Sequence, residues 1–434
     1  MSTPDRPLYR ITQEQLDQIV KRHEMFRNAR MGGARAVLSF FDLSGLDLSG
    51  RDLAHADFSG SVLRGVNLAG AVLDCATLFA CDLRQTNLQS ASMVKSDLRG
   101  ACLRGADLTG ANLVNADLRD GSMAAKERDG SLKVLTVETN PSDMEGAKLS
   151  NANLSQAKLS GAVAMHTDFT DAVMRGTKLV RANLRNATLN GAILEGADLS
   201  GADVRGASLK GAVLTGATMT LTETAGADMT GTLTDKPAGK PLTSLPRPFE
   251  EMVREHALWV GTAGQQGAAL DLSGMDVREA GALSHACLTR LVARGAVFYG
   301  VDLSGAQMQV GQLQDADLRG ANLAGADLRG ANLKGAKLNN ANLRGANLDY
   351  LPISDTRQMC SDLSGAHLRY ADLSGAKLRR ANLAESDLSF ADLNGAELKQ
   401  ADLSRAVLAG AKVKRDQLAS ALLEGASGLP RGVL

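Results

Sequence analysis

The residue types that most often carry chemistry are few in this chain of 434 residues, which has six histidines and five cysteines. None stands in the spacing of a zinc site, a nucleophile elbow or a redox dithiol, such as HExxH, GxSxG or CxxC. Two histidines share a context, because the segments 20–26 and 253–259 both read Val-x-x-His-x-x-aromatic around His23 and His256. We interpret both imidazoles as hydrogen-bonded within the fold, since no further metal ligands accompany them. The sequence predicts no catalytic residue, no metal and no cofactor.

Composition and charge limit the class of protein. Lys and Arg number 48, and so do Asp and Glu, so the formal net charge of zero excludes a polyanionic or polycationic molecule. An odd number of cysteines without paired spacing favours a reducing compartment over a disulfide framework. The start of the chain lacks a signal-peptide core, and no run approaches the roughly 18 apolar residues of a membrane span. We therefore expect a cytoplasmic protein that does not enter the membrane.

A five-residue repeat dominates the chain. Its clearest stretch, residues 316–348, reads ADLRGANLAGADLRGANLKGAKLNNANLRGANL: small, Asp or Asn, Leu, variable, Gly. We call the Leu position the centre of the repeat. Centres run in phase over 43–118 and over 149–229, and then, after Leu272, Val277 and a one-residue slip, over 283–423. This amounts to about 64 repeats, some of them imperfect.

The period indicates an extended chain that turns at regular corners. Alternate side chains of an extended segment share a face, so the centre and the residue two before it point inward together. Aromatic residues make up only 3% of the chain, so Leu and Ala must fill this interior. Gly after the variable position supplies the backbone freedom of a tight corner. A helix is excluded, since a period of five does not keep to one face of it.

The motif resembles that of the pentapeptide-repeat family, A(D/N)LxX, over most of the chain. The resemblance implies an all-β solenoid, a right-handed quadrilateral parallel β-helix in which four repeats make one square coil of about 20 residues. On this fold Cys75, Cys81 and Cys102 fall on neighbouring coils. Cys81 takes an inward position, where Cys acts as a small apolar residue. Their spacing does not favour a metal site.

Two amphipathic helices are predicted, at 15–29 and 248–261, each followed by a Gly-rich stretch and a Leu-Ser-Gly motif. We interpret this as a tandem duplication of a helix followed by a solenoid. The helices would cap open β-helix ends, with Phe26 and Trp259 as plugs of the first coils. The expected organisation is an N-terminal segment and cap helix at 1–34, a first solenoid at 35–231, a linker and second cap helix at 232–262, and a second solenoid at 263–434.

Two irregular stretches interrupt the repeats. The insertion 121–146 contains Asp129-Gly130 between two potential strands, which predicts a projecting β-hairpin over 123–137. The stretch 351–360, LPISDTRQMC, keeps the five-residue frame but lacks the pattern, and we expect it to loop outward.

Residues one coil apart should stack in lanes, and two lanes of the first solenoid are rich in Arg. One holds Arg64, Arg84 and Arg104, and the lane on the preceding face holds Phe79, Arg99 and Arg119. Either these arginines are solvated filler, paired with Asp82, Asp97 and Asp117, or they form a docking strip for an acidic partner, for which the guanidinium fork is suited.

A third lane is expected to be aromatic. Tyr350, Tyr370 and Phe390 each stand two positions after a centre and recur at the interval of one coil. They would line one corner, either as a self-stacking cover or as a partner or dimer interface, since aromatic side chains are enriched at interface cores.

These features favour a non-catalytic scaffold that presents rigid faces to a protein partner, with self-association also possible. The family resemblance implies an alternative, since some members mimic DNA and protect or inhibit DNA gyrase. This chain departs from that pattern, because it is neutral, is Arg-rich on one side, is divided by a linker and ends without an aromatic dimer module. Nothing beyond the unexplained hairpin points to an enzyme. The missing basic excess does not favour direct nucleic-acid binding.

Overall fold

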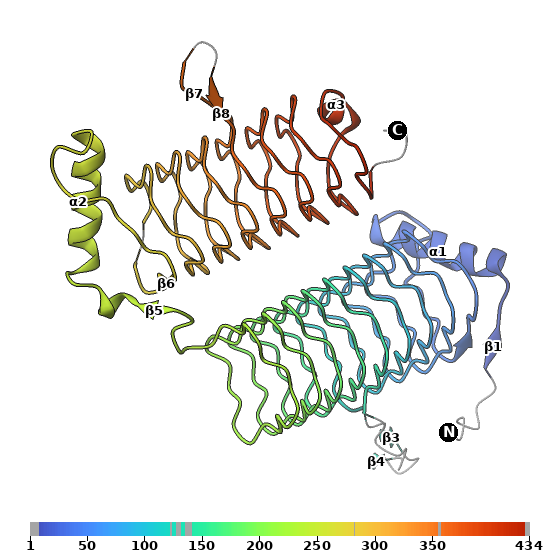
Figure 1. Ribbon diagram of the computed structural model, residues 1–434. Helices are drawn as coiled ribbons and strands as arrows, with labels where there is room; N and C mark the ends of the chain where they lie inside the picture. Colours follow the sequence, from blue (N-terminus) through green and yellow to red (C-terminus); the bar gives the residue numbers. More distant parts are fainter. Residues whose placement is uncertain are drawn as a thin grey trace. The chain divides into compact units, whose positions relative to one another are not determined.

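The computed structural model describes residues 8–121, 124–126, 132–134, 141–281, 283–354 and 357–429. The chain winds into square coils joined by parallel bridges between residues one coil apart, for example from Asp42 to Val62 to Asp82. Bridges recur at every repeat, so each coil has four sides (Figure 1). The period of five and the coil of four repeats are confirmed.

Main-chain hydrogen bonds join each side to the sides before and after it. The N–H of Leu63 donates to the carbonyl of Asp82 at 2.8 Å, and the N–H of Asp82 donates to the carbonyl of Ser61 at 3.0 Å. Inside, Leu83 and Cys81 are 0% and 1% exposed, as alternation requires. The corners take positive φ, 62° at Gly65 and 58° at Gln85, so glycine is favoured there but not required.

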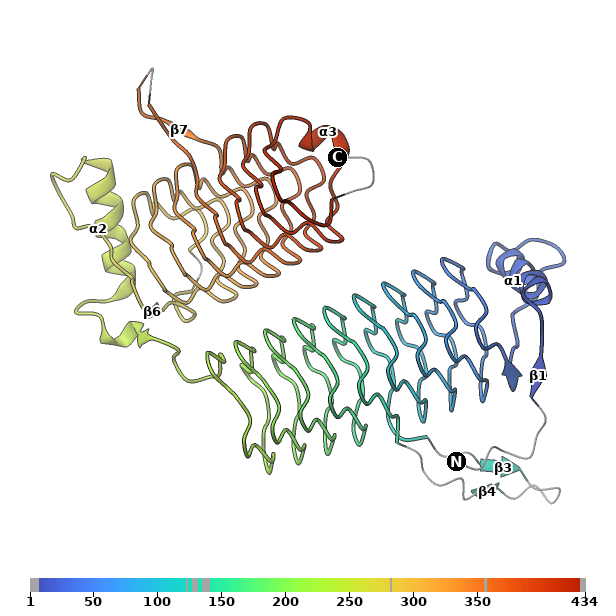
Figure 2. The same cartoon turned by 45° about the vertical axis from the view of Figure 1, so that its right-hand side comes forward.

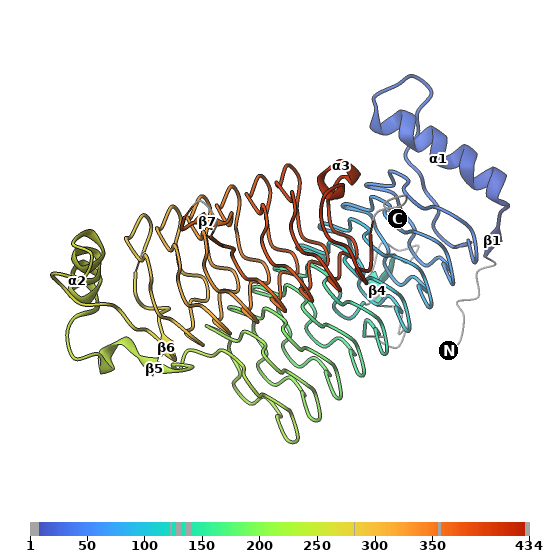
Figure 3. The same cartoon turned by 45° about the horizontal axis from the view of Figure 1, so that its top comes forward.

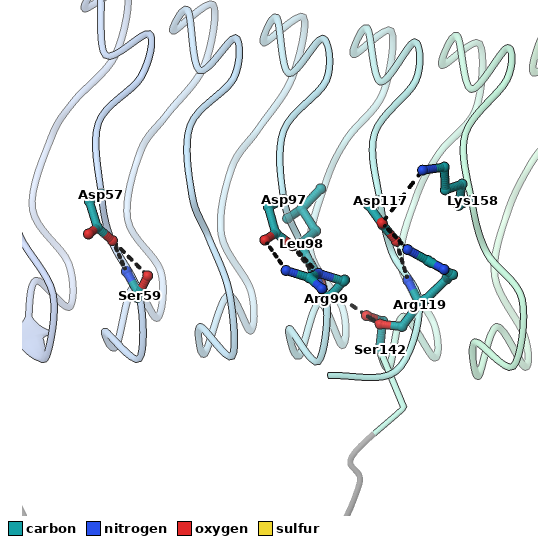
Figure 4. A network of polar contacts seen from close by, with 9 residues as sticks. All are labelled: Asp57, Ser59, Asp97, Leu98, Arg99, Asp117, Arg119, Ser142 and Lys158. Atoms are coloured by element: carbon teal, nitrogen blue, oxygen red, sulfur yellow. Dashed lines mark hydrogen bonds and ion pairs between the residues drawn. The ribbon is translucent and has the colours of Figure 1, made fainter. Parts of the chain in front are cut away.

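The Asp or Asn before each centre has a role that the repeat pattern alone did not reveal. Asp42 Oδ1 accepts a hydrogen bond from the N–H of Ser44 at 3.0 Å, and Asp57 does the same for Ser59 (Figure 4). The short carboxylate thus satisfies an outward backbone N–H at the corner, as in an Asx turn. This explains why the outward position before the centre is so often Asp or Asn, although many polar side chains could face water there.

The chain forms two compact units, Met1–Lys236 and Pro237–Leu434, which we describe separately. The first begins with β1 (Tyr9–Arg10), α1 (Gln13–Arg27) and β2 (Phe41–Asp42), and β1 pairs in parallel with β2. The second begins with β5 (Lys240–Pro241), the 3₁₀ turn η1 (Leu242–Ser244), α2 (Phe249–Gly261) and β6 (Met275–Asp276), and β5 pairs in parallel with β6. Apart from η1, the same order of elements, strand, helix and strand, opens both units.

Each long helix lies against the first coil of its unit (Figures 1 and 3). Thr12 begins α1 with a capping box, in which its hydroxyl accepts from the N–H of Gln15. Leu16 and Val20 are buried in the core of the first unit. The expectation that Phe26 plugs the coil is wrong, because its side chain is 46% exposed, and Trp259 is only partly buried. The register of the helices turns Leu16, Val20 and the histidines inward instead.

The first insertion contains β3 (Ala124–Lys126) and β4 (Leu132–Val134), which pair antiparallel and confirm a hairpin. Its expected Asp129-Gly130 turn lies outside the described residues. Cys102 pairs across the insertion with Asp143, so the later centres lie one position out of the earlier five-residue frame. Among the described residues, no helix is both long and apolar enough to cross a membrane.

The second insertion is also a hairpin, made by β7 (Leu351–Pro352) and β8 (Gln358–Met359), which project from the coils (Figure 2). Asn347 pairs with Lys377, so this insertion lengthens one coil by two repeats. Two repeats are half a coil, which keeps the five-residue frame but turns every later residue to the opposite side. A short helix, α3 (Arg415–Leu418), follows near the end of the second unit, with Leu418 buried.

A buried serine closes the base of each insertion. The Ser142 hydroxyl lies 3.0 Å from the carbonyl oxygen of Leu98 and 2.9 Å from that of Arg119. The Ser361 hydroxyl accepts from the N–H of Gly330 at 3.1 Å and lies 3.0 Å from the carbonyl oxygen of Leu328. Both serines occupy the inward position two before a centre. At the second insertion the Ser361 hydroxyl gives the Gly330 N–H the partner that a carbonyl supplies at regular corners such as Gly325 and Gly335.

Replacing Ser361 with Ala should lower the free energy of unfolding by about 1–3 kcal/mol, because the buried Gly330 N–H loses its partner. Urea unfolding measures this change. Ser364→Ala, which removes a hydroxyl from an outward position beside the same centre, is the control and should cost less than about 0.5 kcal/mol. Equal losses in the two variants would contradict the role given to Ser361.

Candidate functional site

The first Arg lane exists as expected, and acidic side chains neutralise it. Arg64 and Arg84 both bind the carboxylate of Asp82, at 2.5 and 2.6 Å. Arg104 binds Glu145 at 2.5 Å, and the insertion places Glu145 one coil above it. Each guanidinium therefore already has an acidic partner within the protein. These residues line a shallow depression together with Gln85 and Gly105.

The lane on the preceding face is neutralised in the same way (Figure 4). Arg99 and Arg119 each bind the Asp two positions earlier, Asp97 at 2.8 Å and Asp117 at 2.7 Å. These hydrogen bonds raise the pKa of Arg99 and Arg119 above the usual value. The guanidinium of Arg99 also lies 5.5 Å from the ring centroid of Phe79. The arrangement matches the local Asp–Arg pairing that was the alternative to a docking strip.

The aromatic lane is shorter than expected. Tyr370 and Phe390 stack with ring centroids 4.9 Å apart and planes 4° apart. Both rings are half-buried on corners with φ of 58° and 59°. Phe390 leans over the next corner, where a Cβ at Gly410 would lie 2.6 Å from the ring. The stack therefore covers three successive coils at one corner.

Tyr350 does not belong to this stack, which corrects the expected register. It precedes the two inserted repeats, so the residue one coil later at its corner is Arg380 and not Tyr370. The guanidinium of Arg380 lies 5.0 Å from the Tyr350 ring centroid. Half a coil separates the two positions, so Tyr350 lies at the opposite corner of the β-helix. The expectation failed because an insertion that keeps the five-residue frame can still change the lane.

The base of the second hairpin contains a polar cluster that sequence reasoning missed. Arg379 binds the buried carboxylate of Asp349 through Nη2 at 2.5 Å and through Nε at 2.9 Å. Arg380 donates to Gln358 of β8 and, at 2.8 Å, to Gln400 on the next coil. The available signal was the pair of adjacent arginines at 379–380, which stands out in a lane where Gly is usual.

The histidine pair holds the helices to the first coils. Nδ1 of His23 accepts from the N–H of Ala36 at 3.0 Å, and Nε2 lies 3.1 Å from the carbonyl of Ala54. Nδ1 of His256 likewise accepts from the N–H of Leu270 at 3.0 Å. Burial lowers the pKa of both imidazoles, so the neutral forms predominate in the fold. The interpretation of these residues as internal hydrogen-bond partners is confirmed.

The fold should lose stability as the pH falls below about 6.5, because the unfolded chain then binds protons that buried His23 and His256 resist. Melting temperatures at pH 7.5 and 5.5 measure the effect. The double variant His23→Gln/His256→Gln should melt lower at pH 7.5 but show a smaller difference between the two pH values. His367→Gln, at an exposed position, should keep the full difference. An unchanged difference in the double variant would contradict this role.

All five cysteines are free thiols, and their environments differ. Cys81 is buried, with its sulfur 2.9 Å from the carbonyl oxygen of Phe58, and burial raises its pKa to about 12. Cys75 is exposed. Among the described residues, no group of three or more His, Cys, Asp or Glu side chains is placed to hold a metal ion.

An exposed thiol and a buried thiol should differ sharply toward Ellman's reagent at pH 8. Cys75 should react first. Cys81 should stay unreactive until urea unfolds the protein, since only about one in ten thousand such thiols is ionised at this pH. Cys75→Ser should remove the fast phase, and Cys81→Ser should leave the native reaction unchanged. A fast phase that depends on Cys81 would contradict its buried position.

The family model of pentapeptide repeats matches this chain in overlapping segments that cover 42–78, 81–120, 142–233, 312–349 and 361–425. The comparison with curated protein sequences gives no match. Among solved structures, the pentapeptide repeat protein Rfr23 from the cyanobacterium Cyanothece 51142 is 31% identical, with a TM-score of 0.27, over 31% of this chain and 91% of Rfr23.

Two further solved structures are similar at lower identity. HetL from Nostoc sp. strain PCC 7120, a pentapeptide repeat protein involved in heterocyst differentiation regulation, is 22% identical over 89% of this chain and 94% of its own, with a TM-score of 0.19. QnrB1, a plasmid-mediated fluoroquinolone resistance protein, is 18% identical over 47% of this chain and 88% of its own, with a TM-score of 0.26. The family model covers more than half of the chain, which therefore belongs to the pentapeptide repeat family of right-handed quadrilateral β-helices.

Proposed function

We propose that this protein is a non-catalytic scaffold that binds a protein partner through the corner formed by Tyr370 and Phe390. We place it in a reducing compartment, the cytoplasm, because all five thiols are unpaired. The tandem build, with a helix capping each solenoid, would hold two rigid surfaces on one chain. Self-association through the same corner is the form of the proposal in which the partner is a second copy.

The aromatic corner carries the proposal. Bulky residues are disfavoured at positive φ, and glycine occupies most corners of this fold at no such cost. Tyr370 and Phe390 nevertheless take φ of 58° and 59° on consecutive coils. Parallel rings on a rigid backbone offer a large contact area with few rotamers to fix, which suits an interface core. Val407, which is 37% exposed, lies one coil after Asp387, on the face beside this corner, and adds apolar surface next to the two rings.

The charge pattern favours this corner over the Arg lanes. An Arg already bound to an Asp at 2.6–2.8 Å must break that pair before it can bind a partner carboxylate. Arg64, Arg84, Arg99, Arg104 and Arg119 therefore add rim contacts at most. The same pairing does not favour DNA mimicry, which requires an acidic surface, and the formal net charge is zero.

The double variant Tyr370→Ser/Phe390→Ser should lose a partner that the unchanged protein captures from its native lysate. We expect recovery to fall at least about tenfold in quantitative mass spectrometry, since two interface aromatics contribute about 2 kcal/mol or more. Sedimentation velocity on the same proteins tests the second-copy form, in which the dimer would dissociate.

Phe40→Ser is the matched control, because Phe40 is also a corner aromatic with φ of 63° and its ring leans over Gly60 of the next coil. It should leave capture and sedimentation unchanged. If the double variant captures the same proteins and sediments as the unchanged protein does, the corner is structural and the proposal is wrong. Capture of a topoisomerase that survives both substitutions would instead favour DNA mimicry.

A further inference from the structure

The second hairpin is fixed to the β-helix at its base. Asp349 is held by Arg379, Gln358 of β8 is held by Arg380, and Ser361 closes the coil beneath. Met359 packs over Gly330, where a Cβ would lie 3.1 Å from its side chain. The strands therefore project in a set direction and are not a loose loop.

Apolar side chains are exposed on this fixed hairpin. Ile353 is 54% exposed and Met359 is 38% exposed, whereas the coils bury nearly all their large apolar residues. The backbone N–H of Ile353 pairs with the Arg357 carbonyl at 2.9 Å, a bond that does not depend on the Ile353 side chain. Two apolar side chains on a rigid projection are suited to insertion between the side chains of a partner.

The side of the coils that leads into this corner carries cations without acidic partners. Lys377, Arg380 and Lys399 are exposed and, in the part of the chain that the structure describes, none forms an ion pair. Between residues 347 and 399 the acids of this side are Asp349 and Glu397, and Arg379 binds both, at 2.5 and 3.5 Å. This differs from the Arg lanes of the first unit, where every Arg of the two lanes has a carboxylate.

We propose that the β7–β8 hairpin and the side carrying Lys377, Arg380 and Lys399 form one docking surface for an acidic protein segment with apolar side chains among its carboxylates. The bridges place Lys377 one coil beyond Asn347 and Glu397 one coil beyond Lys377, so the cations lie within two coil spacings, about 10 Å, of the hairpin base. This inference rests on the proposed scaffold function and gives that scaffold a second contact, at the corner opposite Tyr370.

Two other anionic partners fit the surface less well. Duplex DNA binds proteins through many phosphate contacts, about 6–10 in typical cases, and the described coils from 347 to 399 offer only three cations without an acidic partner on this side. Recruitment to an anionic membrane takes clusters of about 4–8 basic residues. Three cations beside two exposed apolar side chains match the mixed character of a protein interface.

Fluorescence anisotropy with a labelled peptide in which glutamates flank a Leu-Leu pair tests the surface on the full chain. We expect this peptide to bind at least about tenfold more tightly than the same peptide with glutamine for glutamate. Lys377→Glu/Lys399→Glu should weaken binding at least about tenfold, and Ile353→Ser/Met359→Ser at least about threefold. Circular dichroism checks that each variant remains folded.

The control pair Lys334→Glu/Arg344→Glu makes the same change of charge at exposed positions on two other sides of the same unit and should alter binding less than about twofold. Three results would each overturn the inference. The first is equal weakening by both charge variants. The second is tighter binding to a duplex of about 20 base pairs or to phosphatidylserine vesicles, and the third is no peptide binding at about 1 mM. If the Tyr370→Ser/Phe390→Ser variant keeps its partner while the peptide results hold, the corner is wrong and this surface stands. If the Tyr370→Ser/Phe390→Ser variant loses its partner while the peptide results fail, the corner stands and only the hairpin surface is wrong.

Discussion

Main-chain pairing between residues one coil apart is the constraint on which the rest of the structure depends. Each side of a coil must hydrogen-bond to the sides above and below while a Leu and a small residue fill the interior. Charged side chains therefore take the outward positions of the coils, and the Asp or Asn before the centre uses one of these to satisfy a backbone N–H. The geometry of the coil therefore explains why the chain is so rich in Leu, Ala and Asp, independently of what the protein binds.

The same constraint decides where the protein can depart from its pattern. An insertion must leave and re-enter the β-helix at a corner, and at the second insertion the Ser361 hydroxyl replaces the carbonyl partner of the Gly330 N–H. The length of the insertion then decides the register of the later coils. The first insertion shifts the later repeats by one position out of the five-residue frame. The second adds two whole repeats, which keeps the frame but moves every later residue to the opposite lane. In the second unit, this change of lane brings Arg380 over Tyr350 and fixes the hairpin base.

Sequence alone predicted the period, the inward positions, both helices and the Arg lanes, because these depend on local spacing. It misplaced Phe26, whose position depends on the register of a helix on a coil, and Tyr350, whose lane depends on how much of the chain an insertion removes from the stack. It also missed the Asp349–Arg379 pair, whose members are far apart in the sequence and meet only across that insertion. For the Arg lanes it named pairing with Asp82, Asp97 and Asp117 as one of two alternatives, and only side-chain geometry decides between them.

The central claim is that binding belongs to the aromatic corner and the projecting hairpin of the second unit, and not to the ion-paired Arg lanes of the first. Hydroxyl-radical footprinting of the protein, free and with its captured partner, tests this most directly because it reports on individual side chains. The account predicts protection of Tyr370 and Phe390, and of Ile353 and Met359 when the hairpin also engages. Protection confined to the lanes of Arg64 and Arg99, with these four side chains unchanged, would contradict it.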